Sequence, residues 1–213
     1  MKSAGNDIVA LDAINIERTN DSRFYSKFIT PPELALYSLD IPFESFVWLL
    51  WSAKEAAYKY WQRNQPNLIF SPGKLIIQSL HLPPNFTPTP LTSICESTNQ
   101  YQLVTGTISN GQKQLHFHSI VFTNVLATVV NADEDFDNVY WGIQQIPQTD
   151  SQSQSASVRA FALNKLSDVL KAGELSIAKS EVGHPVVLKS DLAIDIPLSF
   201  AHHEEFVGYS FLI

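Results

Sequence analysis

The sequence has little of two things that many proteins use for function, namely cysteine and positive charge. Cys95 is the single cysteine among 213 residues, so an intramolecular disulfide and a cysteine-based zinc site are both excluded. Lys and Arg number 14 against 21 Asp and Glu, which leaves a formal net charge of −7 at pH 7. Sequence-independent binding of nucleic acid needs a basic surface and is therefore not expected. An anionic ligand would have to be held by a local basic pocket that works against the overall field.

Long apolar runs are also missing. The longest, FVWLLW at 46–51, is far shorter than the about 20 residues with which a helix crosses a bilayer. The first residues, MKSAGNDIVAL, lack the apolar centre of a secretory signal peptide. Hydrophobic residues nonetheless make up 45% of the chain and charged residues 16%, which is typical of a folded globular protein. We therefore expect a cytoplasmic protein without a membrane partner.

Local patterns predict an α+β arrangement with antiparallel sheets. Alternating apolar residues begin a strand in NDIVALDAINI (6–16), and TPPEL (30–34) carries the capping signals of a helix start. Residues 44–63 are predicted as a long helix, and Asn110-Gly111 between two alternating runs predicts a β-hairpin over 101–122. Further strands are expected within 67–80 (strand, turn, strand), 124–131, 138–146, 184–189, 193–200 and 206–213.

A polar, low-complexity stretch, DSQSQSAS at 150–157, is the best candidate for a linker between lobes. It would divide the chain into a first lobe, 1–150, and a second lobe, 151–213. The segment that follows, 157–173, has the periodicity of an amphipathic helix and ends at a glycine. The second lobe is therefore expected to hold one helix and the C-terminal strands.

The segment WSAKEAAYK, at 51–59, places charged residues in a helix that is otherwise apolar. At 100° per residue, Ser52, Glu55, Lys59, Gln62 and Arg63 fall within one sector of that helix. Glu55 and Lys59 are four residues apart and so are neighbours on its surface. The pair fits an exposed helix face with an ordinary ion pair, and it also fits a cation ligand one turn before a phosphate-binding lysine. Spacing alone does not choose between the two.

Several stretches, taken in order along the chain, resemble the motifs of the 4′-phosphopantetheinyl transferase superfamily. GNDIVAL (5–11) resembles its entry strand, RFYSKFITPPEL (23–34) resembles the next segment, and WSAKEAAYK matches its Trp-x-x-Lys-Glu-Ala-x-x-Lys motif. VGHPVVL (182–188) is similar to its Gly-Lys-Pro turn, and PLSFAHHEEFVGYSFLI (197–213) to its histidine-bearing strand pair. The order is that of the short, holo-acyl-carrier-protein-synthase subclass, whereas the length approaches that of the fused subclass. The resemblance implies a monomeric pseudo-dimer of two pseudo-symmetric lobes, each with an antiparallel sheet packed on helices.

The resemblance also implies an activity. The protein would transfer the 4′-phosphopantetheine arm of coenzyme A to a serine of an acyl or peptidyl carrier protein, as in fatty acid biosynthesis, and release adenosine 3′,5′-bisphosphate. Asp7 and Glu55 would be Mg²⁺ ligands and, together with Lys59, the catalytic residues. Lys59 would hold coenzyme A phosphates, and His202 would lie beside the adenosine phosphates. The other coenzyme A-binding positions implied by the resemblance are Lys54, Arg23, Gly183 and Pro185.

The sequence departs from the family pattern at positions near this site. Ala201 stands where serine or threonine is usual, His184 replaces the lysine of the Gly-Lys-Pro turn, and Asn6 replaces an apolar residue. These departures keep open an alternative, a degenerate and non-catalytic member that binds coenzyme A or a partner protein. The group that takes the serine proton is also open between Glu55 and a metal-bound hydroxide.

Two further expectations concern neighbouring residues. His203 follows His202, so a shift of one residue in register would exchange them, and we favour His202 for the nucleotide. Carrier proteins are acidic, so we expect docking near the cations Arg18, Arg23 and Lys27 and away from the acidic stretch DEDFD (133–137).

Overall fold

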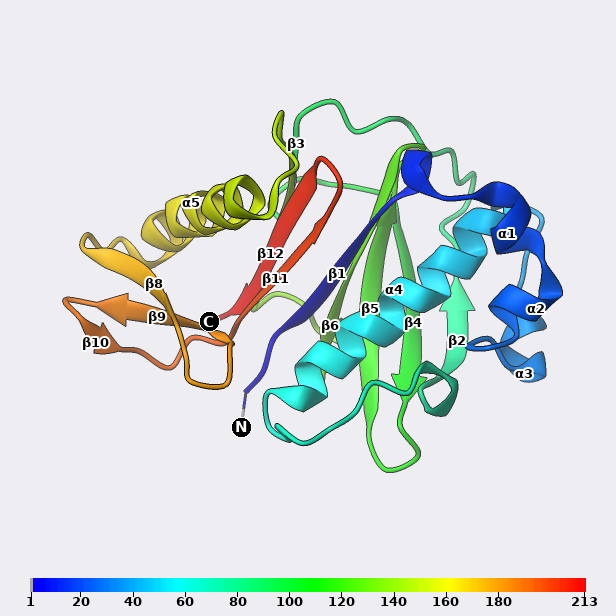
Figure 1. Cartoon of the computed structure of the whole chain (residues 1–213), viewed down its shortest axis with the longest axis horizontal. Coiled ribbons are helices and arrows are strands. Elements are labelled where there is room, and N and C mark those ends of the chain that lie inside the picture. The colour runs from blue at the N-terminus through cyan, green and yellow to red at the C-terminus, as the bar shows by residue number, and fades with distance from the viewer. Residues whose placement is uncertain (1) are drawn as a thin grey trace.

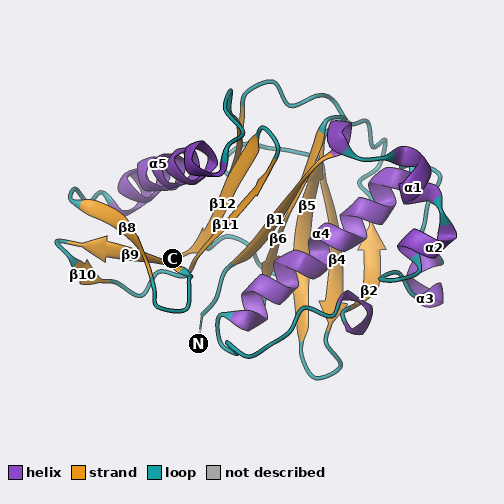
Figure 2. Ribbon diagram, viewed as in Figure 1, coloured by secondary structure: helices purple, strands orange, loops and turns teal. Residues whose placement is uncertain are grey.

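The computed structural model describes residues 2–213 and contains two larger antiparallel sheets with two long helices (Figures 1 and 2). The first sheet has five strands in the order β1-β6-β5-β4-β2. Helix α4 (Phe43–Gln62) lies across one face of this sheet, against β1 and β6. The strands of the first sheet are β1 (Gly5–Ala10), β2 (Ile76–His81), β4 (Leu103–Ser109), β5 (Gln114–Val121) and β6 (Val125–Asn131).

The second sheet has four strands in the order β11-β12-β7-β3, and α5 (Ser151–Leu170) packs against β12. A third, small sheet has the order β10-β9-β8 and lies beside α5 in Figure 1. The strands of these sheets are β3 (Ile94–Glu96), β7 (Val139–Gln145), β8 (Leu175–Lys179), β9 (Pro185–Lys189), β10 (Leu192–Ala193), β11 (Leu198–His203) and β12 (Phe206–Leu212). The short helical segments are η1 (Leu11–Ala13), α1 (Ile16–Asn20), α2 (Ser22–Tyr25), α3 (Pro31–Leu34) and η2 (Pro72–Lys74).

The two halves of the chain repeat one succession of elements. It runs β1–α4–β2–β4–β5–β6 in the first half and β7–α5–β8–β9–β11–β12 in the second. In each half the first strand pairs with the last, which pairs with the strand before it, as β1-β6-β5 and β7-β12-β11. β9 contacts β11 but belongs to the third sheet, whereas β4 pairs with β5 within the first sheet. The expected fold class, α+β with two pseudo-symmetric lobes, is confirmed.

The chain passes from the first sheet to the second for the last time in the acidic turn between β6 and β7, and not at residue 150. The short strand β3, which precedes β4, already belongs to the second sheet. The expected linker at 150–157 is wrong, since α5 already begins at Ser151. Asp150 caps this helix, and its Oδ1 accepts hydrogen bonds from the backbone N–H groups of Gln152 (3.1 Å) and Ser153 (3.0 Å). A polar run after a capping aspartate is thus the exposed first turn of a helix.

Other expected elements differ less. The hairpin around Asn110-Gly111 is present as β4 and β5, and the helix start after Thr30 is present as α3. The expected strand just before Pro72 is absent from the described chain, where only β2 forms after that turn. The proline- and threonine-rich stretch 81–98 suggests an irregular surface excursion, but it contains the short strand β3, which pairs with β7. None of the helices in the described part of the chain is long and apolar enough to cross a membrane.

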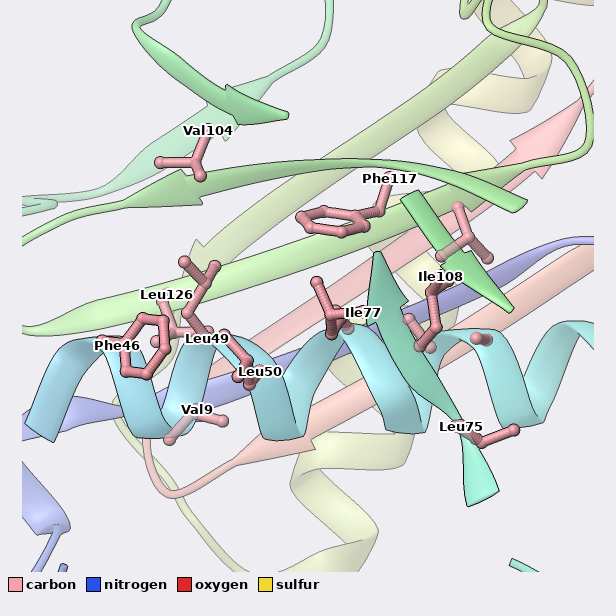
Figure 3. Close-up of a cluster of buried hydrophobic side chains, with 14 of the residues drawn as sticks. Val9, Phe46, Leu49, Leu50, Leu75, Ile77, Val104, Ile108, Phe117 and Leu126 are labelled. Carbon is pink, nitrogen blue, oxygen red and sulfur yellow. The ribbon is translucent and has the colours of Figure 1, made fainter. Parts of the chain in front are cut away.

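The core of the first lobe lies between α4 and its sheet. Figure 3 shows Phe46, Leu49 and Leu50 of α4 among side chains of the sheet such as Leu126 and Phe117. All of these side chains are buried. The helix can pack closely because its 20 residues contain no glycine or proline. The apolar face of α4 thus packs in the core, and the polar stripe that includes Glu55 and Lys59 lies outside this core.

Strand β1 is held between the two lobes. Val9 faces α4, whereas Ile8 and Ala10 belong to the apolar cluster that includes the second sheet. β1 contacts both β11 and β12, and the approach is close because a Cβ at Gly208 would overlap the side chain of Ile8. At the start of β1, a Cβ at Gly5 would overlap the carbonyl oxygen of Ala56 in α4. β1, which carries Asp7, therefore has little freedom to move.

Candidate active site

Asp7 lies on β1, which packs against α4. Lys59 of α4 forms ion pairs with both Asp7 and Glu55. Lys59 Nζ lies 3.2 Å from Asp7 Oδ1 and 3.5 Å from Glu55 Oε1. It also donates a hydrogen bond of 3.0 Å to the backbone oxygen of Asn6. The structure thus brings both predicted carboxylates and the predicted lysine into one group, from two elements far apart in the sequence.

Burial makes the charge on Asp7 costly. The residue is 5% exposed, and burial raises the pKa of its carboxyl from 3.8 to about 6, with Lys59 opposing this shift and Glu55 adding to it. By distance and angle its Oδ2 accepts no hydrogen bond within the described residues, although the nearby Ser52 hydroxyl also lowers the pKa of the carboxyl. A buried carboxylate with one unsatisfied oxygen beside a second carboxylate is a site that a further cation would stabilise.

Glu55 occupies the more open side of the pair. Its side chain is 30% exposed, and Oε2 accepts a hydrogen bond of 3.1 Å from Trp51 Nε1. No cluster of three or more His, Cys, Asp or Glu able to hold a metal occurs within residues 2–213. A cation here would thus have two carboxylates and otherwise water or ligand oxygens, which suits Mg²⁺ and not a caged Zn²⁺ site.

A cavity of about 320 Å³ adjoins this group and is lined by both halves of the chain. Lys59 and Arg63 line it from α4, and Lys179 lines it from the end of β8. Arg63 Nη1 donates to the backbone oxygen of Leu198 (3.0 Å), which ties the end of α4 to the start of β11. The other lining residues include Ala4, Gln62, Ser155, Val158, Gly183, His184, Pro185, Ser199, Phe200 and His202. Three cations around one cavity form the local basic pocket that an acidic protein needs to bind a polyanion.

The two histidines of the cavity are neutral hydrogen-bonding groups at neutral pH. Burial lowers the pKa of His202, and the neighbouring Lys59 and His203 lower it further. Burial and Arg63 likewise lower the pKa of His184. His184 thus does not replace the positive charge of the lysine that is usual in the Gly-Lys-Pro turn.

Most of the predicted positions meet at this place. Asp7, Glu55 and Lys59 form the charged group, and Gly183, Pro185 and His202 line the cavity beside it. Gly183 has a φ of +93°, a conformation that favours glycine, so the turn before Pro185 depends on it. His202 faces the cavity, whereas His203 lines a different depression beside α1.

Two predicted coenzyme A-binding residues lie elsewhere. Lys54 is fully buried in the lobe, 2.7 Å from Glu33 Oε1, and is absent from the cavity lining. The structure does not place Lys54 at the cavity, because its side chain turns into the lobe and pairs there with Glu33. Arg23 is exposed on α2 and does not line the cavity either.

Sequence reasoning missed several lining residues. Arg63 was part of the polar stripe but was given no role, although it continues the stripe one turn beyond Lys59. Lys179 stands five residues before His184, and its stem passes within 3.5 Å of where a Cβ on Gly183 would lie. The spacing between a lysine and a glycine turn is the signal that could have identified it. Ser155 lies in the stretch expected as a linker, and Val158 lies on the expected helix, where no local pattern indicates that it faces a cavity.

Comparison with known proteins agrees with this geometry. The family model described as the 4′-phosphopantetheinyl transferase superfamily matches residues 3–123, more than half of the chain. Comparisons with curated proteins and with solved structures returned no match. The matched range contains Asp7, Glu55 and Lys59 and ends before β6. Transferases of this superfamily use coenzyme A as donor, generally with a metal ion, and act on carrier proteins. The chain belongs to the 4′-phosphopantetheinyl transferase superfamily.

Proposed function

We propose that the chain is a holo-acyl-carrier-protein synthase that transfers the 4′-phosphopantetheine arm of coenzyme A to a serine of an acyl or peptidyl carrier protein. The observation that carries the proposal is the basic cavity lined by Lys59, Arg63 and Lys179, which adjoins the carboxylate pair Asp7 and Glu55. A nucleotide with several phosphates fits such a cavity, and a metal-bound pyrophosphate fits its carboxylate end.

The residues present fit a magnesium ion. Asp7 and Glu55 would hold it, and the unsatisfied Oδ2 of Asp7 offers it a free oxygen. When bound, Mg²⁺ neutralises charge on the pyrophosphate and acts as a Lewis acid. Lys59 adds a positive charge at the same end of the cavity, while the neutral imidazole of His202 supplies hydrogen bonding without further charge.

The transfer itself needs a proton acceptor for the serine. The serine Oγ forms a bond to the phosphorus of the pantetheine phosphate, and the bond from that phosphorus to the bridging oxygen breaks. Adenosine 3′,5′-bisphosphate leaves with the bridging oxygen. Glu55 is the more exposed of the two carboxylates and can take the serine proton, because a carrier approaching from solvent meets it before Asp7.

The carrier would dock on the outer side of α1 and α2. Arg18, Arg23 and Lys27 are exposed there, and Arg18 lies 4.8 Å above the ring of Phe24. Arg18 also lines the depression next to His203. An acidic carrier is attracted by this surface and repelled by the acidic turn 133–137.

Mass spectrometry tests the proposed reaction. The purified protein is incubated with coenzyme A, Mg²⁺ and an unmodified acyl carrier protein, with a carrier whose acceptor serine is replaced by alanine as the control. We expect the mass of one phosphopantetheine group to be added to the unmodified carrier alone. If calorimetry shows that coenzyme A binds but no carrier gains mass, the result would support the non-catalytic alternative. The departures from the family pattern at His184 and Ala201 motivate that alternative.

The positions of the two cavity lysines predict different losses. Lys59→Ala should weaken coenzyme A and dephospho-coenzyme A alike, because Lys59 lies with the carboxylates at the pyrophosphate end. Lys179→Met should weaken coenzyme A more than dephospho-coenzyme A, because Lys179 lines the cavity beside the Gly183 turn, from the half of the chain that does not carry the carboxylates. A charge-assisted contact contributes about 1.5–3 kcal/mol, or roughly 10- to 100-fold in Kd. Calorimetry gives the Kd of each variant for coenzyme A and for dephospho-coenzyme A. If Lys179→Met weakened both ligands equally, as Lys59→Ala is expected to do, the proposed orientation of coenzyme A in the cavity would be wrong.

One chain is sufficient for the site, because both halves of the same chain line the cavity. We therefore expect the specific activity to stay constant on dilution and light scattering to show an active monomer. A specific activity that collapses together with an oligomer on dilution would place the working site between subunits.

A further inference from the structure

The two lobes are tied by hydrogen bonds at both ends of β11. At its start, Leu198 O accepts a bond of 3.0 Å from Arg63, the residue that directly follows α4. At its end, His203 Nδ1 accepts a bond of 3.0 Å from the backbone N–H of Ala10 in β1. The strand that carries His202 is thus fixed to the elements that carry Lys59 and Asp7.

The N–H of Ala10 that donates this hydrogen bond lies on the unpaired edge of the first sheet. β1 is an edge strand, since β6 is its single partner in the sheet among the described strands. The N–H of Leu11 bonds back to Asn124 (2.8 Å), so the N–H of Ala10 points to the open side. An edge N–H without a partner and away from water is costly, and a side-chain acceptor removes that cost. The imidazole of His203 supplies that acceptor.

The histidine is itself held in place by the second lobe. His203 ends β11 just before a tight turn, in which Glu204 has a φ of +50°. The carbonyl oxygen of Glu204 accepts a bond of 2.8 Å from Gln154 of α5, and that of Glu205 accepts one of 2.7 Å from the N–H of Ile146. These two hydrogen bonds attach the turn after His203 to other elements of the second lobe.

We infer that His203 is a positioning residue, which sets β1 and with it Asp7 at a fixed distance from the nucleotide-binding face of β11. The inference rests on the proposed transferase function. Asp7 is three residues before Ala10 on the same strand, and Lys59 holds the other end of this stretch through Asn6 O. His202 and His203 point to opposite sides of β11, one to the cavity and one to β1. One strand thereby couples the carboxylate pair to the nucleotide half of the site.

Two substitutions of His203 distinguish the role of its hydrogen-bond acceptor from the role of its aromatic ring. His203→Phe keeps an aromatic ring but offers Ala10 no acceptor, whereas His203→Asn places an amide oxygen close to where Nδ1 lies. We expect kcat of His203→Phe to fall about 10- to 100-fold, as for a small misplacement of reacting groups. The Kd for coenzyme A should stay within about twofold, because the cavity lining is unchanged. His203→Asn should recover most of kcat.

Amide hydrogen exchange at Ala10 tests the same bond without any assay of activity. Exchange should become at least about tenfold faster in His203→Phe and return toward the wild-type rate in His203→Asn. Tyr209→Phe is the matched control, since it removes a hydroxyl bond to Glu96 (2.8 Å) in the same sheet. It should lower the unfolding temperature but leave kcat and the exchange at Ala10 unchanged.

Each outcome bears on the inference. Unchanged Ala10 exchange in His203→Phe, equal loss of kcat in the phenylalanine and asparagine variants, or a loss of coenzyme A affinity that parallels kcat would each overturn it. If the wild-type protein transfers nothing to any carrier, the proposed function fails. The Ala10 exchange rates would then still decide whether His203 holds β1.

Discussion

Glu55→Gln should abolish phosphopantetheinyl transfer while leaving the fold intact. The substitution removes one of the two carboxylate charges that would hold Mg²⁺, and the apolar face of α4 that packs the helix is untouched. A Lewis-acid cation supplies several kcal/mol, and about 1.4 kcal/mol is a factor of ten, so we expect kcat/KM to fall by about 100-fold or more. Carrier modification measured by mass spectrometry over time gives the rate, and circular dichroism checks the fold.

The companion variant Asp7→Asn should lose a similar factor, and the double variant should lose little more than either one. Both residues would act through the same ion, so their effects are not additive. A variant with one carboxylate that keeps most of the wild-type rate would remove that residue from the metal site.

Metal binding can be followed without activity. Mg²⁺ added together with coenzyme A should raise the unfolding temperature of the wild-type protein more than coenzyme A alone does, because a ligand that binds only the folded state stabilises it. The increment due to Mg²⁺ should be absent in Glu55→Gln. An equal increment in both proteins would place the ion elsewhere.

Much of the first lobe could be predicted from local patterns. The capping signals around Thr30 are realised in α3, where the carboxylate of Glu33 accepts bonds from the N–H and hydroxyl of Thr30 (2.9 Å each). The Asn110-Gly111 turn and the long helix also follow from spacing and turn chemistry. These signals succeed because each is settled within a few residues of the chain.

The parts that could not be predicted depend on distant partners. The short strand β3 forms because Ile94–Glu96 pairs with β7, more than 40 residues later, and no local pattern announces that pairing. The polar start of α5 looks like a linker until Asp150 is recognised as its cap. Likewise, the polar stripe of α4 indicates a site, but it does not indicate that β11 lies opposite. The hydrogen bond between Arg63 and Leu198 therefore could not be predicted from the sequence.

Helix geometry bears on the assignment of Lys54. Lys54 is adjacent to Glu55 in the motif, and the family resemblance implies a coenzyme A-binding role for it. Glu55 and Lys59 share a face at four residues' spacing, whereas Lys54 is turned well away from both. In the structure it points into the lobe, where it is 0% exposed and paired with an equally buried Glu33.

The buried pair carries the second large expected effect. Lys54 Nζ lies 2.7 Å from Glu33 Oε1 and also donates to the backbone oxygen of Phe28. Burial lowers the pKa of Lys54, and Glu33 opposes that shift. Glu33 also accepts a bond of 2.8 Å from the N–H of Ile77, so the pair joins α3, α4 and β2. Removing one member leaves a buried charge without its partner.

Lys54→Met should therefore destabilise the protein by about 3–5 kcal/mol. For a domain of this size that is a fall in unfolding temperature of roughly 6–20 °C. The double variant Lys54→Met with Glu33→Gln should recover part of this loss, because it no longer buries an unpaired charge. The Kd for coenzyme A, measured by calorimetry below the unfolding transition, should match that of the wild type in both variants. If Lys54→Met instead keeps its stability to within about 1 kcal/mol and loses coenzyme A affinity, this lysine acts on the ligand and not on the fold.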